Sequence, residues 1–301
     1  MSSAPPELIR RIMLPHAGAQ AVDNVSDFLR AIRALISDLD GTLVAGNRPQ
    51  GGLIPFLAFL RRREIAFTVV TNNTVRTPEE YSIELSALGA EVPPAQILTA
   101  AGATAAYLRS ELAPAAPVFV VGEKGLRVAL AEAGFTLVED SSGPAAAVVV
   151  GGDRAVTYDK LKHAIRHVRR GARFIGTNPD VLVPVEDGLA PEAGVLLAAI
   201  AAGAGVAPTI IGKPERPLLE LALRRMGSTP AQTAILGDRL DTDILGGRRL
   251  GLTTILVLTG ADDRTTIQAT GITPDLVVTG LEELTELWTQ AASSGPLQLR
   301  R

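Results

Sequence analysis

The chain has 301 residues, of which 47% are apolar, so it can build one large core or two smaller ones, and we expect two. Its lack of cysteine excludes a disulfide framework, a thiolate nucleophile and a cysteine zinc site. A net charge of −3 and an aromatic content of 4% argue against a nucleic-acid partner, which would need a basic surface or a stacking platform.

The N-terminal residues 1–29 are predicted to be an extension, to which we assign no role. Arg10 and Arg11 are not followed by a long apolar stretch, so we do not expect a secretory signal. Residues 193–211 carry no charge and are long enough to suggest a membrane span, but glycine and proline interrupt them. We therefore expect a buried helix, a turn and a strand there, and a soluble, cytoplasmic protein without a membrane partner.

A short apolar run before Ser37 predicts a buried strand that ends in two acids, Asp38 and Asp40. In an open parallel sheet, chemistry collects at the carboxyl ends of the strands. Two acids held together there repel each other unless a cation lies between them. A calcium loop is an alternative, but its fifth and twelfth positions need acids, and this chain has Thr42 and Pro49 there.

Strand and helix signals alternate along the rest of the chain, which predicts an α/β fold with a mainly parallel sheet. We expect strands near 65–70, 118–121, 146–150, 173–175, 210–211, 233–236 and 254–258, and helices near 53–63, 77–89, 99–112, 124–133, 159–170 and 214–227. Thr77 and Glu80 form a capping-box pattern at one helix start. The simplest organisation is a Rossmann-like core, residues 30–96 and 207–301, interrupted by an inserted α/β cap domain, residues 97–206.

Three further strand ends carry polar groups: Thr71 with Asn72, Lys213, and Asp238 with Asp243. We expect a parallel sheet to bring them to the same edge as the first two acids. Three or four carboxylates suit Mg²⁺, and a lysine with a hydroxyl suits a dianionic phosphoryl group. A P-loop is excluded because Gly212-Lys213 is followed by Pro214 and lacks the earlier glycine.

Four segments, 38–42, 71–73, 212–214 and 237–244, resemble the four motifs of the haloacid dehalogenase (HAD) superfamily, complete and in order. They are most similar to the class IIA subclass, whose α/β cap is inserted between the second and third motifs. That subclass includes 4-nitrophenylphosphatases, phosphoglycolate phosphatases and nucleotide phosphatases. The resemblance covers about residues 30–290 and implies a Mg²⁺-dependent phosphatase with a Rossmann-like HAD core.

The resemblance also implies catalytic roles. Asp38 is the expected nucleophile, which forms an aspartyl-phosphate. Asp40 is expected to protonate the leaving oxygen and later to accept a proton from water. Thr71 holds phosphoryl oxygens in this scheme, and Lys213 offsets the charge that develops during transfer.

Metal and substrate ligands are implied in the same way. Mg²⁺ is expected on Asp38, Asp238 and the backbone carbonyl of Asp40, with Asp243 as a further ligand or as a residue that orients one. Asp241 is expected to be a solvated helix residue. Substrate binding is assigned to Thr71, Asn72, Asn73, Lys213, Asn178 and Val183, of which the last two lie in a segment similar to the specificity loop of related phosphatases.

His163 and His167 are spaced four residues apart on a predicted helix and could pair on a metal. Their neighbours Lys162, Arg166, Arg169 and Arg170 repel cations. We therefore expect a solvated basic helix face here.

Taken together, these features predict an enzyme, a phosphatase of small phosphomonoesters. Val181, Leu182 and Val183 offer no charge or aromatic ring to a base, which favours glycerol 3-phosphate or 2-phosphoglycolate. Alternatives are a nucleotide or sugar phosphatase of the same mechanism, or a non-catalytic phosphometabolite-binding protein. The intact Asp38 and Asp40 argue against the last one. Phosphotransfer to a second substrate and a homodimeric state are left open.

Overall fold

The computed structural model describes residues 25–185 and 188–293. Most of the predicted N-terminal extension lies outside the described residues, and its last part begins α2 (Val25–Ala31). The chain packs as two compact units. Within the described part, the first unit holds the residues up to Val69, Leu85–Glu91 and the residues from Ala222, and the second holds Val70–Glu84 and Val92–Leu221. The predicted cap boundaries stay a prediction.

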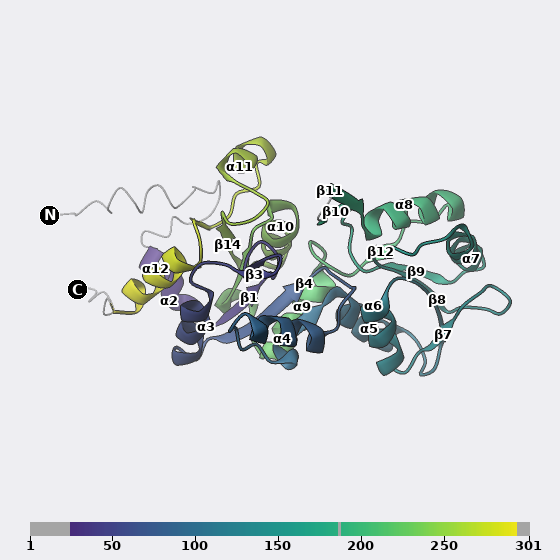
Figure 1. The fold of residues 1–301 in the computed structure, drawn as a ribbon, viewed down its shortest axis with the longest axis horizontal. Helices are drawn as coiled ribbons and strands as arrows, with labels where there is room; N and C mark the ends of the chain where they lie inside the picture. Colours follow the sequence, from purple (N-terminus) through teal and green to yellow (C-terminus); the bar gives the residue numbers. More distant parts are fainter. Residues whose placement is uncertain (1–24, 186–187, 294–301) are drawn as a thin grey trace. The chain divides into compact units, whose positions relative to one another are not determined.

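The first sheet has six strands in the order β15-β14-β13-β1-β4-β5 (Figure 1). Their bounds are β1 Ala34–Ser37, β4 Ala66–Thr71, β5 Ile97–Thr99, β13 Thr233–Gly237, β14 Thr253–Val257 and β15 Leu276–Val278. β1 pairs in parallel with β13 and β4, and Ser37 lies opposite both Leu236 and Val69. The residues that follow β1 and β13 therefore leave the sheet at the same edge.

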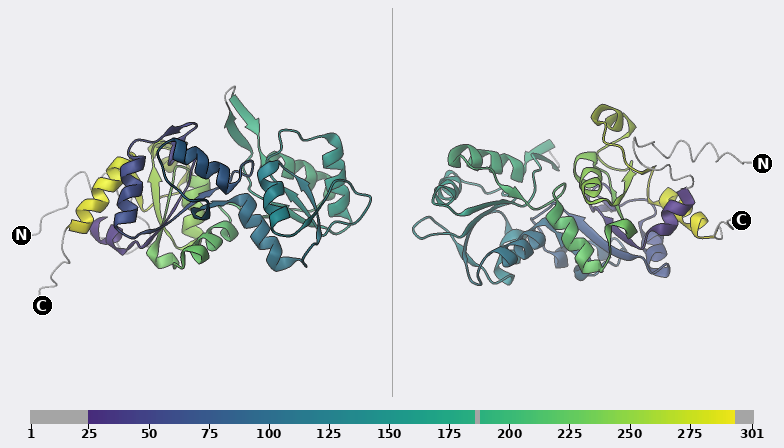
Figure 2. Two further views of the ribbon diagram at one scale, coloured as in Figure 1. Left: turned by 60° about the horizontal axis from the view of Figure 1, so that its bottom comes forward. Right: turned by 180° about the vertical axis from the view of Figure 1, so that it is seen from behind.

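Apolar helix faces cover this sheet. Helices α3 (Leu53–Arg62) and α12 (Leu281–Ser293) pack against each other, and α12 also packs against α2 (Figures 1 and 2). The rings of Phe59 and Trp288 lie 5.6 Å apart between α3 and α12. On β14 lies α10 (Leu245–Leu250), which continues a π-helical turn, η3 (Leu240–Ile244). Further elements are the β2–β3 hairpin (Val44–Ala45 and Arg48–Pro49) and α11 (Arg264–Thr270).

The second unit contains a parallel sheet in the order β12-β9-β8-β6-β7. Its strands are β6 Pro117–Val121, β7 Thr136–Val138, β8 Ala147–Val150, β9 Arg173–Gly176 and β12 Thr209–Ile210. Its helices are α5 Ala100–Glu111, α6 Lys124–Glu132, α7 Tyr158–Arg169 and α8 Ala193–Ala204. Figures 1 and 2 show α5 with α6 on one face of the sheet and α7 with α8 on the other. A core of buried apolar side chains, including Phe119 and Phe174, fills the α7–α8 side.

The remaining elements connect these layers. Helix α4 (Pro78–Ala87) begins with the predicted capping box, since the Thr77 N–H donates to Glu80 Oε2 at 2.9 Å and the Glu80 N–H donates to Thr77 Oγ1 at 3.3 Å. Helix α9 is Arg216–Met226, and short helical turns lie at Pro94–Gln96 and Pro230–Gln232. The β10–β11 hairpin (Leu182–Val185 and Gly188–Pro191) is an antiparallel element that the sequence does not predict.

The α/β fold is confirmed, and so is the helix, turn and strand expected over 193–211, which is α8 followed by β12. Among the described residues, no helix combines the length and the apolar character that crossing a membrane requires. One expectation about topology is wrong. The strand before Lys213, β12, pairs with β9 in the second sheet and not with the strands that precede Asp38 and Asp238. β12 is only two residues long, so its own sequence does not specify its partner.

The expected solvated face at His163 and His167 is also wrong for one residue. His167 is 1% exposed, its ring lies 5.2 Å from the ring of Phe119, and its Nε2 is 2.8 Å from the Asp140 carbonyl oxygen. His163 is half-buried and its Nδ1 accepts a hydrogen bond from the Ser141 N–H at 3.1 Å. Packing on Phe119, a residue far away in sequence, overrides the polar character of this helix face.

Replacing Gly247 by alanine should destabilise the first unit. A Cβ at this position of α10 would lie 2.4 Å from Ile235 Cγ2 and 2.9 Å from Thr254 Cγ2. Overpacking of this kind costs about 1–3 kcal/mol. That exceeds the roughly 0.8–1 kcal/mol that alanine gains over glycine in a helix. Trp288, the only tryptophan, reports on this unit, so its fluorescence during urea unfolding should show a lower midpoint.

Gly51→Ala is the matched control, because its Cβ would lie 3.5 Å from Glu282 Oε1, an ordinary contact. We expect its midpoint to stay close to that of the parent protein. A raised midpoint for Gly247→Ala would mean that helix propensity decides the outcome and would contradict the close packing of α10 on the sheet.

Candidate functional site

Three buried acids meet at the carboxyl edge of the first sheet. Asp38 follows β1, Asp238 follows β13, and Asp243 lies in η3. One carboxylate oxygen of each lies within 4.8 Å of the others. The parallel pairing of β1 with β13 explains why acids about 200 positions apart in sequence share one place.

Backbone amides orient these carboxylates. The Leu39 N–H donates to Asp38 Oδ1 at 2.8 Å, and the Ala261 N–H donates to Asp238 Oδ2 at 2.8 Å. The Arg239 N–H donates to Asp243 Oδ2 at 3.2 Å. Hydrogen bonds of this kind stabilise a carboxylate anion and fix its direction.

Glycines make the space that the acids occupy. A Cβ at Gly41 would lie 2.2 Å from Asp238 Oδ2, and a Cβ at Gly260 would lie 1.9 Å from the same oxygen. A Cβ at Gly237 would lie 2.2 Å from Asp243 Cγ. Gly41 also has a φ of +79°, which other residues rarely adopt. Any larger residue at these positions would push the acids out of place.

Two side chains, one near in sequence and one distant, stabilise the turn at Gly41. Its carbonyl oxygen accepts a hydrogen bond from Thr259 Oγ1 at 2.7 Å and one from Gln50 Nε2 at 3.2 Å. The motif around Asp38 points to Gly41, but no motif in the sequence points to Gly260, Thr259 or Gln50. The sequence does contain one signal for these positions. Gly41 follows β1, Gly237 ends β13 and Gly260 follows β14. A glycine at the end of a strand often marks a place where another part of the chain approaches the backbone closely.

The three acids fit a divalent metal ion. Like charges buried this close destabilise each other, and oxygen ligands with backbone support are what Mg²⁺ and similar hard cations bind. Asp40 is exposed in the turn that follows Asp38, where a leaving group in solvent contact could receive its proton. Asp241 has a side chain 63% exposed and pairs with Arg239 at 3.0 Å, as expected for a solvated residue.

The other predicted site residues gather in the second unit. Asn72 and Lys213 are joined twice: the Lys213 N–H donates to Asn72 Oδ1 at 2.8 Å, and Asn72 Nδ2 donates to the Lys213 carbonyl at 2.9 Å. Thr71 is buried, and its Oγ1 accepts from the Asn73 N–H at 3.1 Å. Lys213 is 1% exposed, so it is a buried lysine and not a surface one.

The predicted specificity loop also contacts Asn72. Asn178 Nδ2 donates to the Asn72 carbonyl at 2.9 Å, and Asn72 Nδ2 donates to Asp180 Oδ2 at 2.9 Å. Val183 is half-buried in the β10–β11 hairpin. The sequence motif pointed to this loop, but it gave no sign that Asp180 is a partner of the second motif.

Comparisons with known proteins agree with this picture. Residues 35–136 match the family model described as haloacid dehalogenase-like hydrolase, and residues 210–284 match a second model described as HAD-hydrolase-like. An acid sugar phosphatase of Staphylococcus aureus is 38% identical over 255 residues, which cover 85% of this chain and 97% of that protein.

Two solved structures are similar over most of the chain. A p-nitrophenyl phosphatase from Archaeoglobus fulgidus superposes with a TM-score of 0.80 at 33% identity and covers 85% of this chain and 98% of its own. A glycerol phosphate phosphatase from Mycobacterium tuberculosis, in complex with magnesium, gives 0.79 at 32% identity, with 85% and 77% covered. The chain belongs to the haloacid dehalogenase-like hydrolases and, among them, to the class IIA capped phosphatases.

Proposed function

We propose that this phosphatase depends on Mg²⁺ and hydrolyses small phosphomonoesters through an aspartyl-phosphate on Asp38. The observation that carries the proposal is the cluster of Asp38, Asp238 and Asp243, whose oxygens lie within 4.8 Å of one another. These three acids, with the backbone carbonyl of Asp40, would hold the metal ion. A bound Mg²⁺ would offset the negative charge of the phosphoryl oxygens near the nucleophile.

The two acids of the first motif divide the chemistry. Asp38, held through its own Oδ1 by the Leu39 N–H, attacks phosphorus with its other carboxylate oxygen, and the bond to the leaving oxygen breaks. Asp40 gives its proton to that leaving oxygen. Water then attacks the phosphorus of the aspartyl-phosphate while Asp40 takes a proton from it. The bond between phosphorus and the Asp38 oxygen breaks, inorganic phosphate leaves, and both side chains are restored.

Thr71, Asn72, Asn73 and Lys213 would hold the transferred phosphoryl group. Two features support this part of the proposal. Val69, the register partner of Ser37, precedes Thr71 by two residues on the same strand, and Asp38 directly follows Ser37. The double hydrogen bond between Asn72 and the Lys213 backbone fixes these two residues in one arrangement, as charge stabilisation in a transition state requires.

For the substrate we propose a small polyol or sugar phosphate, with glycerol 3-phosphate as the first candidate. The relatives act on sugar phosphates, glycerol phosphate and p-nitrophenyl phosphate, as their names state. Val183 and its neighbours carry no aromatic ring on which a nucleobase could stack. A phosphate panel assayed with Mg²⁺ tests this choice.

Hydrolysis of 4-nitrophenyl phosphate should require Mg²⁺ and should stop when a chelator removes it. Asp243→Asn should weaken Mg²⁺ binding at least about tenfold, the usual effect of losing a metal ligand or a group that orients one. Isothermal titration of the metal-free protein with Mg²⁺ measures this directly, and turnover gives a second readout.

Asp241→Asn is the matched control, because Asp241 stands two positions away, is mostly exposed and pairs with Arg239. Its Mg²⁺ affinity should equal that of the parent. Full activity after exhaustive chelation, or equal affinities for both variants, would contradict the metal assignment.

Exchanging each catalytic acid for asparagine should give two different defects. Asp38→Asn should abolish turnover of all esters, because no nucleophile remains. Asp40→Asn should slow hydrolysis of glycerol 3-phosphate at least about a hundredfold, the usual range for a lost general acid. The loss should be smaller for 4-nitrophenyl phosphate, whose leaving group needs less help from a proton.

The measurement is kcat and kcat/KM for both esters in the three proteins, with acid quenching and mass spectrometry to locate the phosphoryl group. Normal turnover by Asp38→Asn would reject nucleophilic catalysis at that residue. Equal losses on both esters in Asp40→Asn would reject its role as a proton donor.

A further inference from the structure

The second sheet has a topological switch point of its own. After β6 the chain moves to β7 on one side, and then returns to β8 on the other side of β6 before it continues to β9 and β12. In open parallel sheets, ligands bind outside the carboxyl ends of the strands where the order reverses in this way. The loops that follow β6 and β8 should therefore line a ligand site.

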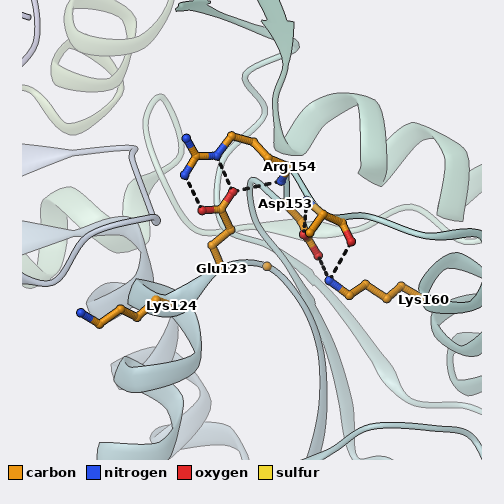
Figure 3. Close-up of a pocket in the computed structure, with 7 residues that line it drawn as sticks. Glu123, Lys124, Asp153, Arg154 and Lys160 are labelled. Carbon is orange, nitrogen blue, oxygen red and sulfur yellow. Dashed lines mark hydrogen bonds and ion pairs between the residues drawn. The ribbon is translucent and has the colours of Figure 1, made fainter.

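An open hollow of about 430 Å³ lies where these two loops meet (Figure 3). Its volume is within the range of small-molecule sites. It is lined by Gly122, Glu123, Lys124, Asp153, Arg154, Ala155 and Lys160. Five of these seven residues are charged, so the hollow suits a hydrated, hydrogen-bonding ligand.

The charges in this hollow are largely paired. Arg154 binds Glu123 through two hydrogen bonds of 2.7 Å, and Lys160 binds the buried Asp153 at 2.7 Å (Figure 3). The Arg154 contacts lower the pKa of the Glu123 carboxyl, which keeps it an anion. Lys124, the third base of the lining, pairs with Glu80. Because all three bases are already bound to carboxylates, none is left to attract an acidic ligand.

A third acid, Glu192, lies beside the same loop. A Cβ at Gly152 would lie 2.4 Å from Glu192 Oε1 and 2.7 Å from its Oε2, so the glycine leaves room for this carboxylate. Burial raises the pKa of Glu192, and hydrogen bonds from the Ala193 N–H and Asn178 lower it in part. The charges of Asp180 and Glu123 raise it further, so Glu192 lies within electrostatic range of both acids.

Glu192 is connected to the proposed phosphoryl-binding residues. The Glu192 N–H donates to the Val181 carbonyl in the same loop at 3.0 Å, and Asn178 Nδ2 donates to the Asn72 carbonyl at 2.9 Å. Asp180 accepts from Asn72 Nδ2, and Asn72 is bound to Lys213. A polar strip thus lies within the second unit and consists of Lys213, Asn72, Asn178, Asp180 and Glu192. It ends beside Gly152, the residue before Asp153 of the hollow.

A buried hydroxyl next to the strip, that of Thr74, has no hydrogen-bond partner among the described residues. Thr74 Oγ1 lies 2.8 Å from the position that a Cβ of Gly151 would take, and Thr177 Oγ1 lies 3.2 Å from the same point. Both hydroxyls therefore pack closely against Gly151, where a side chain would not fit.

We propose that Glu192 and Asp180 accept hydrogen bonds from the hydroxyl groups of the substrate's leaving group, and that they exclude leaving groups that carry a carboxylate. The inference rests on the proposed phosphatase function and narrows its substrate class to neutral polyol and sugar phosphates. It separates glycerol 3-phosphate from 2-phosphoglycolate, which the sequence alone does not.

The selection has an attractive and a repulsive part. A charged acceptor strengthens a hydrogen bond from a substrate hydroxyl, and the same charge repels a substrate carboxylate. The strip and the hollow together hold four acids, Asp180, Glu192, Glu123 and Asp153. The hollow has three bases, Lys124, Arg154 and Lys160, of which Lys124 is paired with Glu80 outside the lining. The excess of negative charge disfavours an acidic leaving group even though Lys213 favours its phosphate.

Glu192→Gln tests the proposal, because it keeps the shape of the side chain and removes its charge. We expect the preference for glycerol 3-phosphate over 2-phosphoglycolate, taken as the ratio of kcat/KM values, to fall roughly tenfold to a hundredfold, as for other losses of a charge-assisted hydrogen bond. Gly152→Ala should shift the ratio in the same direction, since its Cβ would displace the Glu192 carboxylate without removing it.

Glu139→Gln and Gly143→Ala are the matched controls. Glu139 is an exposed partner of Arg127 in the same unit, and a Cβ at Gly143 would meet no atom within 4 Å. Both should keep the parent ratio. An unchanged ratio in Glu192→Gln, or an equal loss on both substrates, would overturn the assignment of Glu192 to the leaving group.

Binding separates this inference from the proposed reaction. In an Asp38→Asn background, which cannot form the aspartyl-phosphate, isothermal titration with each ester in the presence of Mg²⁺ should show the same preference and its loss on Glu192→Gln. Suppose that the parent protein binds with this preference but hydrolyses neither ester. The proposed reaction would then be rejected, and the role of Glu192 and Asp180 in binding the leaving group would be supported. If the parent protein hydrolyses both esters but binds them equally well, only the role of Glu192 and Asp180 in selecting the leaving group would be rejected.

Discussion

The arrangement of the site in the first unit has to overcome the mutual repulsion of three neighbouring carboxylates, those of Asp38, Asp238 and Asp243. Two unit charges 4 Å apart interact by about 4 kcal/mol at an effective dielectric constant near 20. That is a large part of the roughly 5–15 kcal/mol by which a folded domain is stable. The glycines at 41, 237 and 260 leave room for the carboxylates. The backbone N–H groups of Leu39, Arg239 and Ala261 donate hydrogen bonds to them. A cation turns the remaining repulsion into attraction.

Each of the two sheets has a polar site at the point where its strand order reverses, but the two sites differ in chemistry. In the first sheet the strand order reverses between β1 and β13, and the acids that suit a metal follow these two strands. In the second sheet it reverses between β6 and β8, and a hollow with paired charges lies there. One switch point thus presents concentrated negative charge to a cation, while the other presents a polar surface. This separation suits the proposed reaction, in which the same phosphoryl transfer is carried out on esters with different leaving groups.

Local signals in the sequence were sufficient for much of this. The apolar run before Asp38 and the one before Asp238 each specify a strand, and the polar residues directly after them specify a site. Prediction failed where a partner is distant and the segment is short. β12 has two residues and joins the other sheet, and His167 is buried by Phe119. The space at Gly152 could not be predicted, because a glycine does not reveal which side chain will fill it.

The hydrogen bonds around Asn72 have a consequence for protein engineering. Asn178 and Asp180 bind Asn72, and the Thr177 carbonyl accepts from the Gly212 N–H at 2.7 Å. A chimera that takes residues 97–206 from a relative would therefore combine a foreign loop with the native second and third motifs. The proposed phosphoryl-binding residues would then be held by contacts between segments of two different proteins. Grafts that transfer substrate preference between such enzymes should carry Asn72 and Gly212-Lys213 along with the loop.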